Sequence, residues 1–327
     1  MKKILLSVIA LVGTMSTFAQ NALVASLSHG TNVQMFYGNT ALQEAVNVAE
    51  SGDIINLSSG TFLSADIKKA ITLRGVGIVG DNPTYILNNF TIEIPTEDAN
   101  RFMMEGIRCQ GTMFTKGTFA NPYFVKCQFK AVQNASESDA VTNKMFVNCK
   151  IVGNTNVGAN DSYYFVNSFV TGIAHYQNAS LTAVNCVLNT GVYGLTQSDF
   201  YNCIFYTTRY TESKLPTGTK ATNCYFVEYD GDSYAYTPFN DECVNCGRFK
   251  YTEMFKTFTG RNYTDAETFE LTDEAKAIYL GTDGKEIGLY GGLQPYNLKP
   301  SYPLISTMTV GEQTDANGQL NVTIEVE

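Results

Sequence analysis

Cysteine is the residue of this chain whose spacing most suggests chemistry. The chain has eight cysteines, and most of them end a short apolar run, as in FVNCKI at 146–151 and FYNCIF at 200–205. A repeated thiol could bind a metal, form a disulfide or act as a nucleophile. One copy, FVNSFV at 165–170, has Ser168 in place of cysteine. Because serine fills the same space without the same reactivity, we interpret the position as a small residue facing the core.

The pair Cys243 and Cys246, in CVNC, is the one place where two cysteines lie close together in sequence. A metal site there would need two more soft ligands nearby, and both histidines, His29 and His175, are distant in sequence. We therefore expect no metal and no cofactor. The pair is either a local disulfide or one more coil with an additional core cysteine.

Enzymes that cleave glycans need paired carboxylates, or carboxylates with a basic residue. Between Cys109 and Val227 the only carboxylates are those of Glu137, Asp139, Asp161, Asp199 and Glu212. The catalytic candidates are Arg101, Arg108 and Asp161, the first of them within TIEIPTEDANRFMMEG at 91–106, which could project as a loop. Asp199 and Lys220, each three residues before an asparagine of the repeat, predict a surface ion pair.

Tyrosine gives the clearer indication of binding. A run of tyrosines falls in consecutive repeats and could form a stripe on which sugar rings stack. Its members are Tyr163, Tyr164, Tyr176, Tyr193, Tyr201, Tyr206 and Tyr210. The alternative is that these tyrosines are amphipathic fillers of β-strands.

The cysteines belong to a repeat that must position all of these residues. Aligned positions are Cys127, Cys149, Ser168, Cys186, Cys203, Cys224 and Cys246, separated by 17 to 22 residues, and Cys109 is aligned as an eighth copy. A period near 20 with strand-forming cores indicates a solenoid of stacked β coils. In six copies the residue two after the cysteine position is apolar, so the two share the inward face. These residues are Phe129, Ile151, Val170, Leu188, Phe205 and Phe226.

Asparagine precedes the cysteine position in most copies, at Asn148, Asn167, Asn185, Asn202 and Asn223. Asparagine tolerates the left-handed backbone conformation, so it predicts a sharp corner there. Equivalent asparagines in successive coils could stack into a ladder of amide hydrogen bonds, one strand spacing apart.

With these motifs the sequence resembles a right-handed, single-stranded parallel β-helix of the pectin-lyase-like type, an all-β fold. NTALQEAVNVAESGDIINLSSGTF at 39–62 resembles the opening of that fold, with a capping helix near 40–50. GTDGKEIGLYGGLQPY at 281–296 is similar to the end of secreted β-helix proteins from Bacteroides-like bacteria. The predicted organisation is a β-helix over 20–300 and a β-hairpin extension over 301–327.

The first 19 residues, MKKILLSVIALVGTMSTFA, are typical of a signal peptide. We expect export to the periplasm, the outer surface or the medium, without a transmembrane segment. The net charge is −9 with no basic stripe, which argues against nucleic acid as a partner. The predicted function is a non-catalytic β-helix that presents a rigid face to a carbohydrate or a host-surface ligand. The alternative is a polysaccharide lyase or glycoside hydrolase, to which the resemblance in fold alone points.

Overall fold

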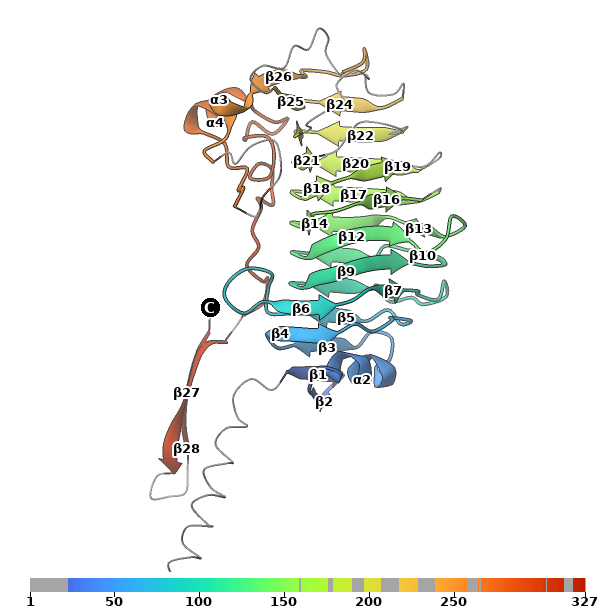
Figure 1. Ribbon diagram of the computed structural model, residues 1–327, viewed down its shortest axis with the longest axis vertical. Coiled ribbons are helices and arrows are strands. Elements are labelled where there is room, and N and C mark those ends of the chain that lie inside the picture. Colours follow the sequence, from blue (N-terminus) through green and yellow to red (C-terminus); the bar gives the residue numbers. More distant parts are fainter. Residues whose placement is uncertain are drawn as a thin grey trace, which may run out of the picture.

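The computed structural model describes residues 23–158, 160–175, 179–189, 197–206, 218–228, 239–257, 264, 266–303, 305–314 and 320–326. In these residues the chain winds into an elongated stack of β coils, with about 20 residues per turn (Figure 1). The predicted signal peptide lies outside them. No helix among the described residues is long and apolar enough to cross a membrane.

One side of the stack is a sheet that we call sheet A. In spatial order it contains β2 (Asn32–Tyr37), β1 (Val24–His29), β3 (Ile54–Leu57), β5 (Thr72–Arg74), β8 (Met103–Glu105), β11 (Tyr123–Val125), β14 (Lys144–Val147), β17 (Ser162–Val166), β20 (Ser180–Val184), β22 (Ser198–Tyr201) and β24 (Lys220–Thr222). Strand β1 pairs antiparallel with β2 and β3, and the following pairs are parallel. One strand per coil is the pattern expected of a solenoid.

The second sheet, sheet B, takes the next strand of each coil. Its order is β4 (Gly60–Leu63), β6 (Thr84–Leu87), β9 (Arg108–Thr115), β12 (Gln128–Asn134), β15 (Lys150–Ile151), β18 (Phe169–Thr171), β21 (Val187–Asn189), β23 (Ile204–Phe205), β25 (Tyr225–Glu228) and β26 (Gly247–Lys250). Short strands complete some coils. These are β7 (Phe90–Ile92), β10 (Thr118–Ala120), β13 (Ala140–Thr142), β16 (Thr155–Val157) and β19 (Ile173–His175).

A single left-handed residue turns the chain from sheet A into sheet B. At this corner the backbone angle φ lies between 44° and 66° in Gly106, Lys126, Asn148, Asn167, Asn185, Asn202, Asn223 and Asn245. The next residue points inward and has no exposed surface at Ile107, Cys127, Cys149, Ser168, Cys186, Cys203 and Cys224. The asparagine of the repeat therefore forms the corner, and the cysteine or serine after it points into the core, as the sequence repeat predicts.

Two details of the predicted repeat are wrong. Cys109 is not the eighth copy, because it pairs with Phe129 and so occupies the apolar position two residues after the thiol position. The side-chain amides of Asn167 and Asn202 also bond to the C-terminal part of the chain and not to a neighbouring asparagine. Asn167 Nδ2 donates to Leu289 O at 2.7 Å and Gly291 O at 2.8 Å, since the C-terminal part of the chain lies against this corner.

The left-handed corner gives a direct test of the asparagine. Asn148→Ala should lower the free energy of unfolding by about 1–2 kcal/mol, because alanine is strained at φ 53°. Asn148→Gly should be close to neutral, since glycine adopts this conformation freely and the amide oxygen of Asn148 has no hydrogen-bond partner to lose. Urea denaturation of the two variants measures the difference, and equal costs would contradict the assignment.

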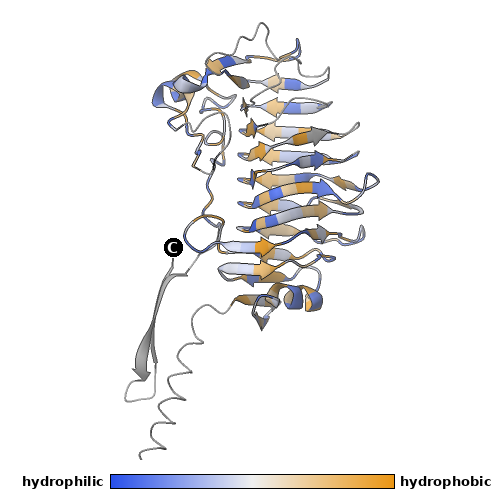
Figure 2. Ribbon diagram, viewed as in Figure 1, coloured by the Kyte–Doolittle hydropathy of each residue, from blue (hydrophilic) through white to orange (hydrophobic). Residues whose placement is uncertain are grey.

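The interior is a column of aromatic rings and thiols. Phe124 and Phe146 stack with ring centroids 4.7 Å apart, and Phe146 and Phe165 with centroids 5.2 Å apart. All eight cysteines are free. Figure 2 shows that hydrophobic residues recur in coil after coil along the stack, as a shared interior requires.

Helices lie near both ends of the stack. At the N-terminal end, α2 (Ala41–Val48) buries Ala41, Leu42, Ala45 and Val46. At the other end, α3 (Tyr251–Met254) and α4 (Asp273–Ile278) pack beside β26. A hairpin of β27 (Ile305–Thr314) and β28 (Leu320–Val326) lies beyond the solenoid (Figure 1).

Between α4 and this hairpin, residues 281–302 form what we call the exit segment, which descends along the corner of the solenoid (Figure 1). Thr282 N donates to Asn202 Oδ1 at 3.0 Å near its beginning. Lys299 O accepts from Lys126 Nζ, and Ser301 N donates to Glu105 Oε1 at 3.0 Å near its end. The exit segment thus connects coils that are far apart along the stack.

Candidate ligand-binding surface

The outer face of sheet A carries two rows of side chains in register. The central residue of each strand, such as Phe124, Phe146 or Phe165, is buried, so its neighbours point outward. The first row is Met103, Tyr123, Met145, Tyr164, Thr182, Asp199 and Lys220. The second row is Val125, Val147, Val166, Val184, Tyr201 and Thr222. We call these two rows the sheet A face.

The exit segment forms one wall of a groove along this face. The groove has a volume of about 400 Å³. Its floor includes Tyr123, Met145, Val147, Val166 and Val184, and its far wall is formed by residues 282–283 and 292–294. A largely apolar concave surface with polar groups at its edge is typical of a binding site.

Two tyrosines of the sheet A face remain accessible. Tyr164 is 38% exposed and Tyr201 is 37% exposed. They lie on β17 and β22, with β20 between them. Because neighbouring strands are spaced by about 4.8 Å, the two rings stand about 10 Å apart along the stack.

Arg101 lies toward the N-terminal end of the sheet A face, beside β11. Its guanidinium carbon is 4.2 Å from the centroid of the Tyr123 ring, and its Nε donates to Asn121 O at 2.8 Å. Tyr123 is two strands from Tyr164, since β14 separates β11 from β17. Tyrosines therefore recur on every second strand, at β11, β17 and β22.

The structure divides the predicted tyrosine stripe. Tyr164 and Tyr201 are on the sheet A face, but Tyr163 and Tyr206 have no exposed surface. Successive side chains of a strand point to opposite faces, so Tyr163 points inward where its neighbour Tyr164 points outward. Tyr206 packs against Phe269, with ring centroids 5.2 Å apart. Assigning these two to a binding stripe was wrong. Tyr176, Tyr193 and Tyr210 lie outside the described residues.

Tyr123 and Met145 are two members of the face that the sequence prediction missed. The signal was present, because Tyr123 precedes Phe124 and Met145 precedes Phe146 in the same alternation that the cysteine repeat defines. The exit segment gave no such signal, since its hydrogen bonds to the sheet A corner join residues 80 to 124 positions apart.

The catalytic candidates do not form one site. Arg101 stacks on Tyr123, whereas Arg108 is on sheet B with its guanidinium carbon 5.6 Å from the centroid of the Tyr85 ring. Asp161 is 2% exposed and bonds to Lys144 Nζ at 2.9 Å. Asp161 was therefore a wrong choice for a group that meets an external substrate. Asp199 and Lys220 are direct partners in the register of β22 and β24, but no ion pair joins these two side chains in the described part of the chain.

The remaining cysteine pair is not a disulfide. Cys243 and Cys246 are both free and partly buried, and they pack against the core. Burial raises the pKa of the Cys243 thiol, so it stays protonated near neutral pH. Among the described residues, no group of three or more His, Cys, Asp or Glu side chains is arranged to hold a metal ion.

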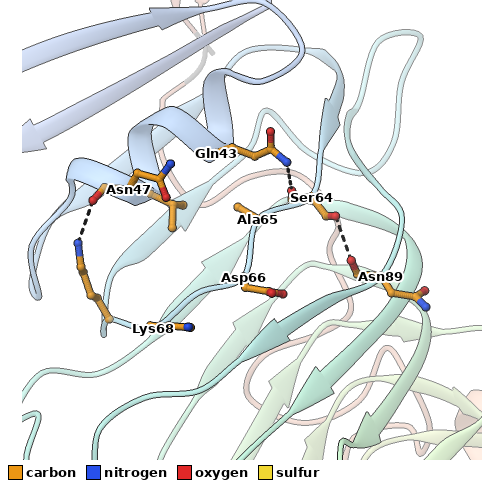
Figure 3. Close-up of a pocket in the computed structure, with 9 residues that line it drawn as sticks. Gln43, Asn47, Ser64, Ala65, Asp66, Lys68 and Asn89 are labelled. Atoms are coloured by element: carbon orange, nitrogen blue, oxygen red, sulfur yellow. Dashed lines mark hydrogen bonds between the residues drawn. The ribbon is translucent and has the colours of Figure 1, made fainter.

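A second hollow, of about 600 Å³, separates α2 from the first coils (Figure 3). Its polar groups mostly bond to each other. Gln43 Nε2 donates to Ser64 O at 2.8 Å, and Ser64 Oγ donates to Asn89 O at 2.9 Å. Lys69 Nζ donates to Asn47 O at 3.2 Å. Because these bonds join the capping helix to the stack, we interpret this hollow as a seam between them.

These features define the chain as a parallel β-solenoid with a groove on one sheet. In comparisons with protein-family models, curated proteins and solved structures, nothing matches the chain. The fold by itself does not specify an activity. The functional argument therefore rests on the sheet A face.

Proposed function

We propose that this chain is an exported, non-catalytic β-helix protein, similar in architecture to pectin-lyase-like proteins, that binds carbohydrate on the sheet A face. The observation that supports this function is the pair of accessible rings, Tyr164 and Tyr201, beside an apolar groove. Tyrosine presents a flat apolar ring to a sugar and a hydroxyl to its polar groups. The N-terminal 19 residues support export.

The spacing of the tyrosines favours an extended ligand. Tyr123 and Tyr164 lie in the first row and Tyr201 lies in the second, on every second strand and about 10 Å apart along the stack. The strands are held in register by backbone hydrogen bonds, so the rings are positioned before a ligand arrives and little ordering entropy is lost on binding. An unbranched polysaccharide running obliquely along the stack would meet Tyr164 and Tyr201 in turn.

The proposal is tested by binding to a glycan array, followed by titration calorimetry on each glycan that binds. The double variant Tyr164→Ala, Tyr201→Ala should weaken binding by about fivefold or more, since each aromatic contact contributes about 0.5–1.5 kcal/mol beyond its buried area. Tyr37→Ala is the matched control, because Tyr37 is an exposed tyrosine on β2, the edge strand of sheet A, and belongs to neither of the two rows.

Equal weakening by the control variant, or no weakening by the double variant, would contradict the proposed surface. Each glycan that binds should also be incubated with the protein and assayed for unsaturated products and for new reducing ends. Cleavage of any of them would contradict the non-catalytic part of the proposal and favour the lyase or hydrolase alternative.

A further inference from the structure

A group of polar side chains is enclosed in the middle of the stack. Lys144 has no exposed surface, Asp161 is 2% exposed and Tyr163 has no exposed surface. Lys144 and Tyr163 are direct partners on β14 and β17 and point inward beside Phe146 and Phe165. A charged group so far from water is costly unless it is fully paired.

Lys144 Nζ has three polar neighbours within hydrogen-bond distance. It lies 2.7 Å from Asn134 Oδ1, 2.9 Å from Asp161 Oδ2 and 3.0 Å from the Tyr163 hydroxyl. The amine also lies 4.5 Å from the centroid of the Tyr163 ring. Burial lowers the pKa of Lys144 to about 8, so its uncharged, nucleophilic form is readily reached near neutral pH.

Asp161 is arranged to accept a proton. Its Oδ1 accepts from Val141 N at 2.7 Å, and its Oδ2 accepts from Gly158 N at 3.0 Å as well as from Lys144. These contacts fix the orientation of the carboxyl group, with Oδ2 toward the Lys144 amine. A carboxylate is a poor electrophile but a suitable base for an adjacent ammonium.

Asn134 presents an activated amide to the same amine. Its Oδ1 accepts a second hydrogen bond, from Thr115 Oγ1 at 2.8 Å, so two donors withdraw electron density from the amide carbon. Its Nδ2 donates to Asp139 O at 3.1 Å, which orients the amide. A Cβ atom at Gly158 would lie 2.2 Å from Nδ2, so the absence of a side chain there makes room for this group.

We propose that Lys144 and Asn134 join in an intramolecular isopeptide bond, with Asp161 as the proton acceptor. Asp161 takes one proton from the Lys144 ammonium, and Nζ attacks Asn134 Cγ. A second proton passes from Nζ to Nδ2, the Cγ–Nδ2 bond breaks and ammonia leaves with the proton held by Asp161, as ammonium. The Nζ–Cγ amide bond replaces the lost one, so no oxidant, metal or cofactor takes part.

The bond would close a covalent ring around residues 134–144, between the end of β12 and the start of β14. These strands belong to successive coils, so the ring would fasten one coil to the next inside the stack. The reaction is autocatalytic and needs only the folded chain, because the three groups come from three separate segments.

Mass spectrometry of the folded wild-type protein tests this proposal. The expected intact mass is that of the expressed polypeptide minus one ammonia. Digestion with trypsin should leave residues 131–150 uncut at Lys144. A further cut after Glu137 by a glutamate-specific protease should then leave peptides 131–137 and 138–150 joined to each other. Cleavage after Lys126, which is also buried but faces the carbonyl of Lys299, is the internal control.

Asp161→Asn keeps the shape of the base and removes its charge, and Lys144→Met removes the nucleophile. Both variants should show the unmodified mass. An unmodified mass in the folded wild-type protein would overturn the proposal without any variant. Loss of water with a link to Asp161 would overturn it too, as would an ammonia loss in which the two peptides separate, because the latter indicates a succinimide at Asn134.

Discussion

Phe146→Ala should lower the free energy of unfolding by about 3–5 kcal/mol, the range found when a fully buried aromatic ring is removed. Phe146 has no exposed surface and stacks on Phe124 and Phe165 from the coils below and above. It also meets the edge of Phe129 with centroids 5.8 Å apart. Its removal would leave a cavity that the hydrogen-bonded coils on either side cannot close.

Met145→Ala is the matched control for this prediction. Met145 is adjacent on the same strand but points to the sheet A face, where it is only partly buried. Urea denaturation at neutral pH should show a clearly smaller loss for Met145→Ala than for Phe146→Ala. A reversed order would mean that the strand faces the other way.

Alkaline pH should destabilise the protein steeply. Burial raises the pKa of five inward thiols, which are Cys109, Cys127, Cys149, Cys203 and Cys224. For Cys149 the value rises from 9.0 to about 12. Above pH 9 the unfolded chain loses thiol protons that the folded chain keeps, so the folded state binds more protons and stability falls as pH rises.

The size of this effect follows from the number of thiols. Between pH 8 and pH 10 each one lowers the free energy of unfolding by about 1.4 kcal/mol, and the five together by about 7 kcal/mol. A free Lys144 amine would raise stability over this range, whereas the thiols lower it. Its pKa in the folded state is about 8, so the folded protein loses the Lys144 proton at a lower pH than the unfolded chain does. This difference adds about 2 kcal/mol to the free energy of unfolding between pH 8 and pH 10.

Denaturation at pH 8, 9 and 10 under reducing conditions measures this dependence. Cys149→Ser should reduce the slope by the share of one thiol, and the structure shows that the position accepts serine. Ser168, the equivalent residue of the next coil, is buried with its hydroxyl 2.9 Å from Val166 O and 3.2 Å from Phe146 O. A stability that does not change between pH 8 and pH 10 would contradict the buried-thiol interpretation.

The parts of the structure that the sequence predicted are those that repeat. Asn148 and Cys149 recur with a fixed offset, and that offset alone identifies a corner followed by an inward residue. Ser168, the one aligned copy without cysteine, indicated that this position needs a small residue facing the core. Strand alternation then fixes which neighbours face outward, and applying it from Phe146 to Phe165 would have placed Tyr163 inside and Tyr164 outside.

The features that escaped prediction depend on contacts without a sequence period. Tyr206 is buried because Phe255 and Phe269, about 50 or more positions later, return to cover it. The wall of the groove comes from the exit segment, which reaches Asn167 from 122 positions away. Lys144 resembles a surface residue in the sequence, and only the strand register shows that it faces Asp161 in the interior.

The exit segment changes how the solenoid can come apart. In a plain stack each coil contacts only its neighbours, so the terminal coils can fray one at a time. Here residues 281–302 bond to the corners of coils near Asn202, Asn167, Lys126 and Glu105. Coils at different heights must then lose contact with the same segment before they separate, so unfolding becomes more cooperative than the one-dimensional repeat alone would allow.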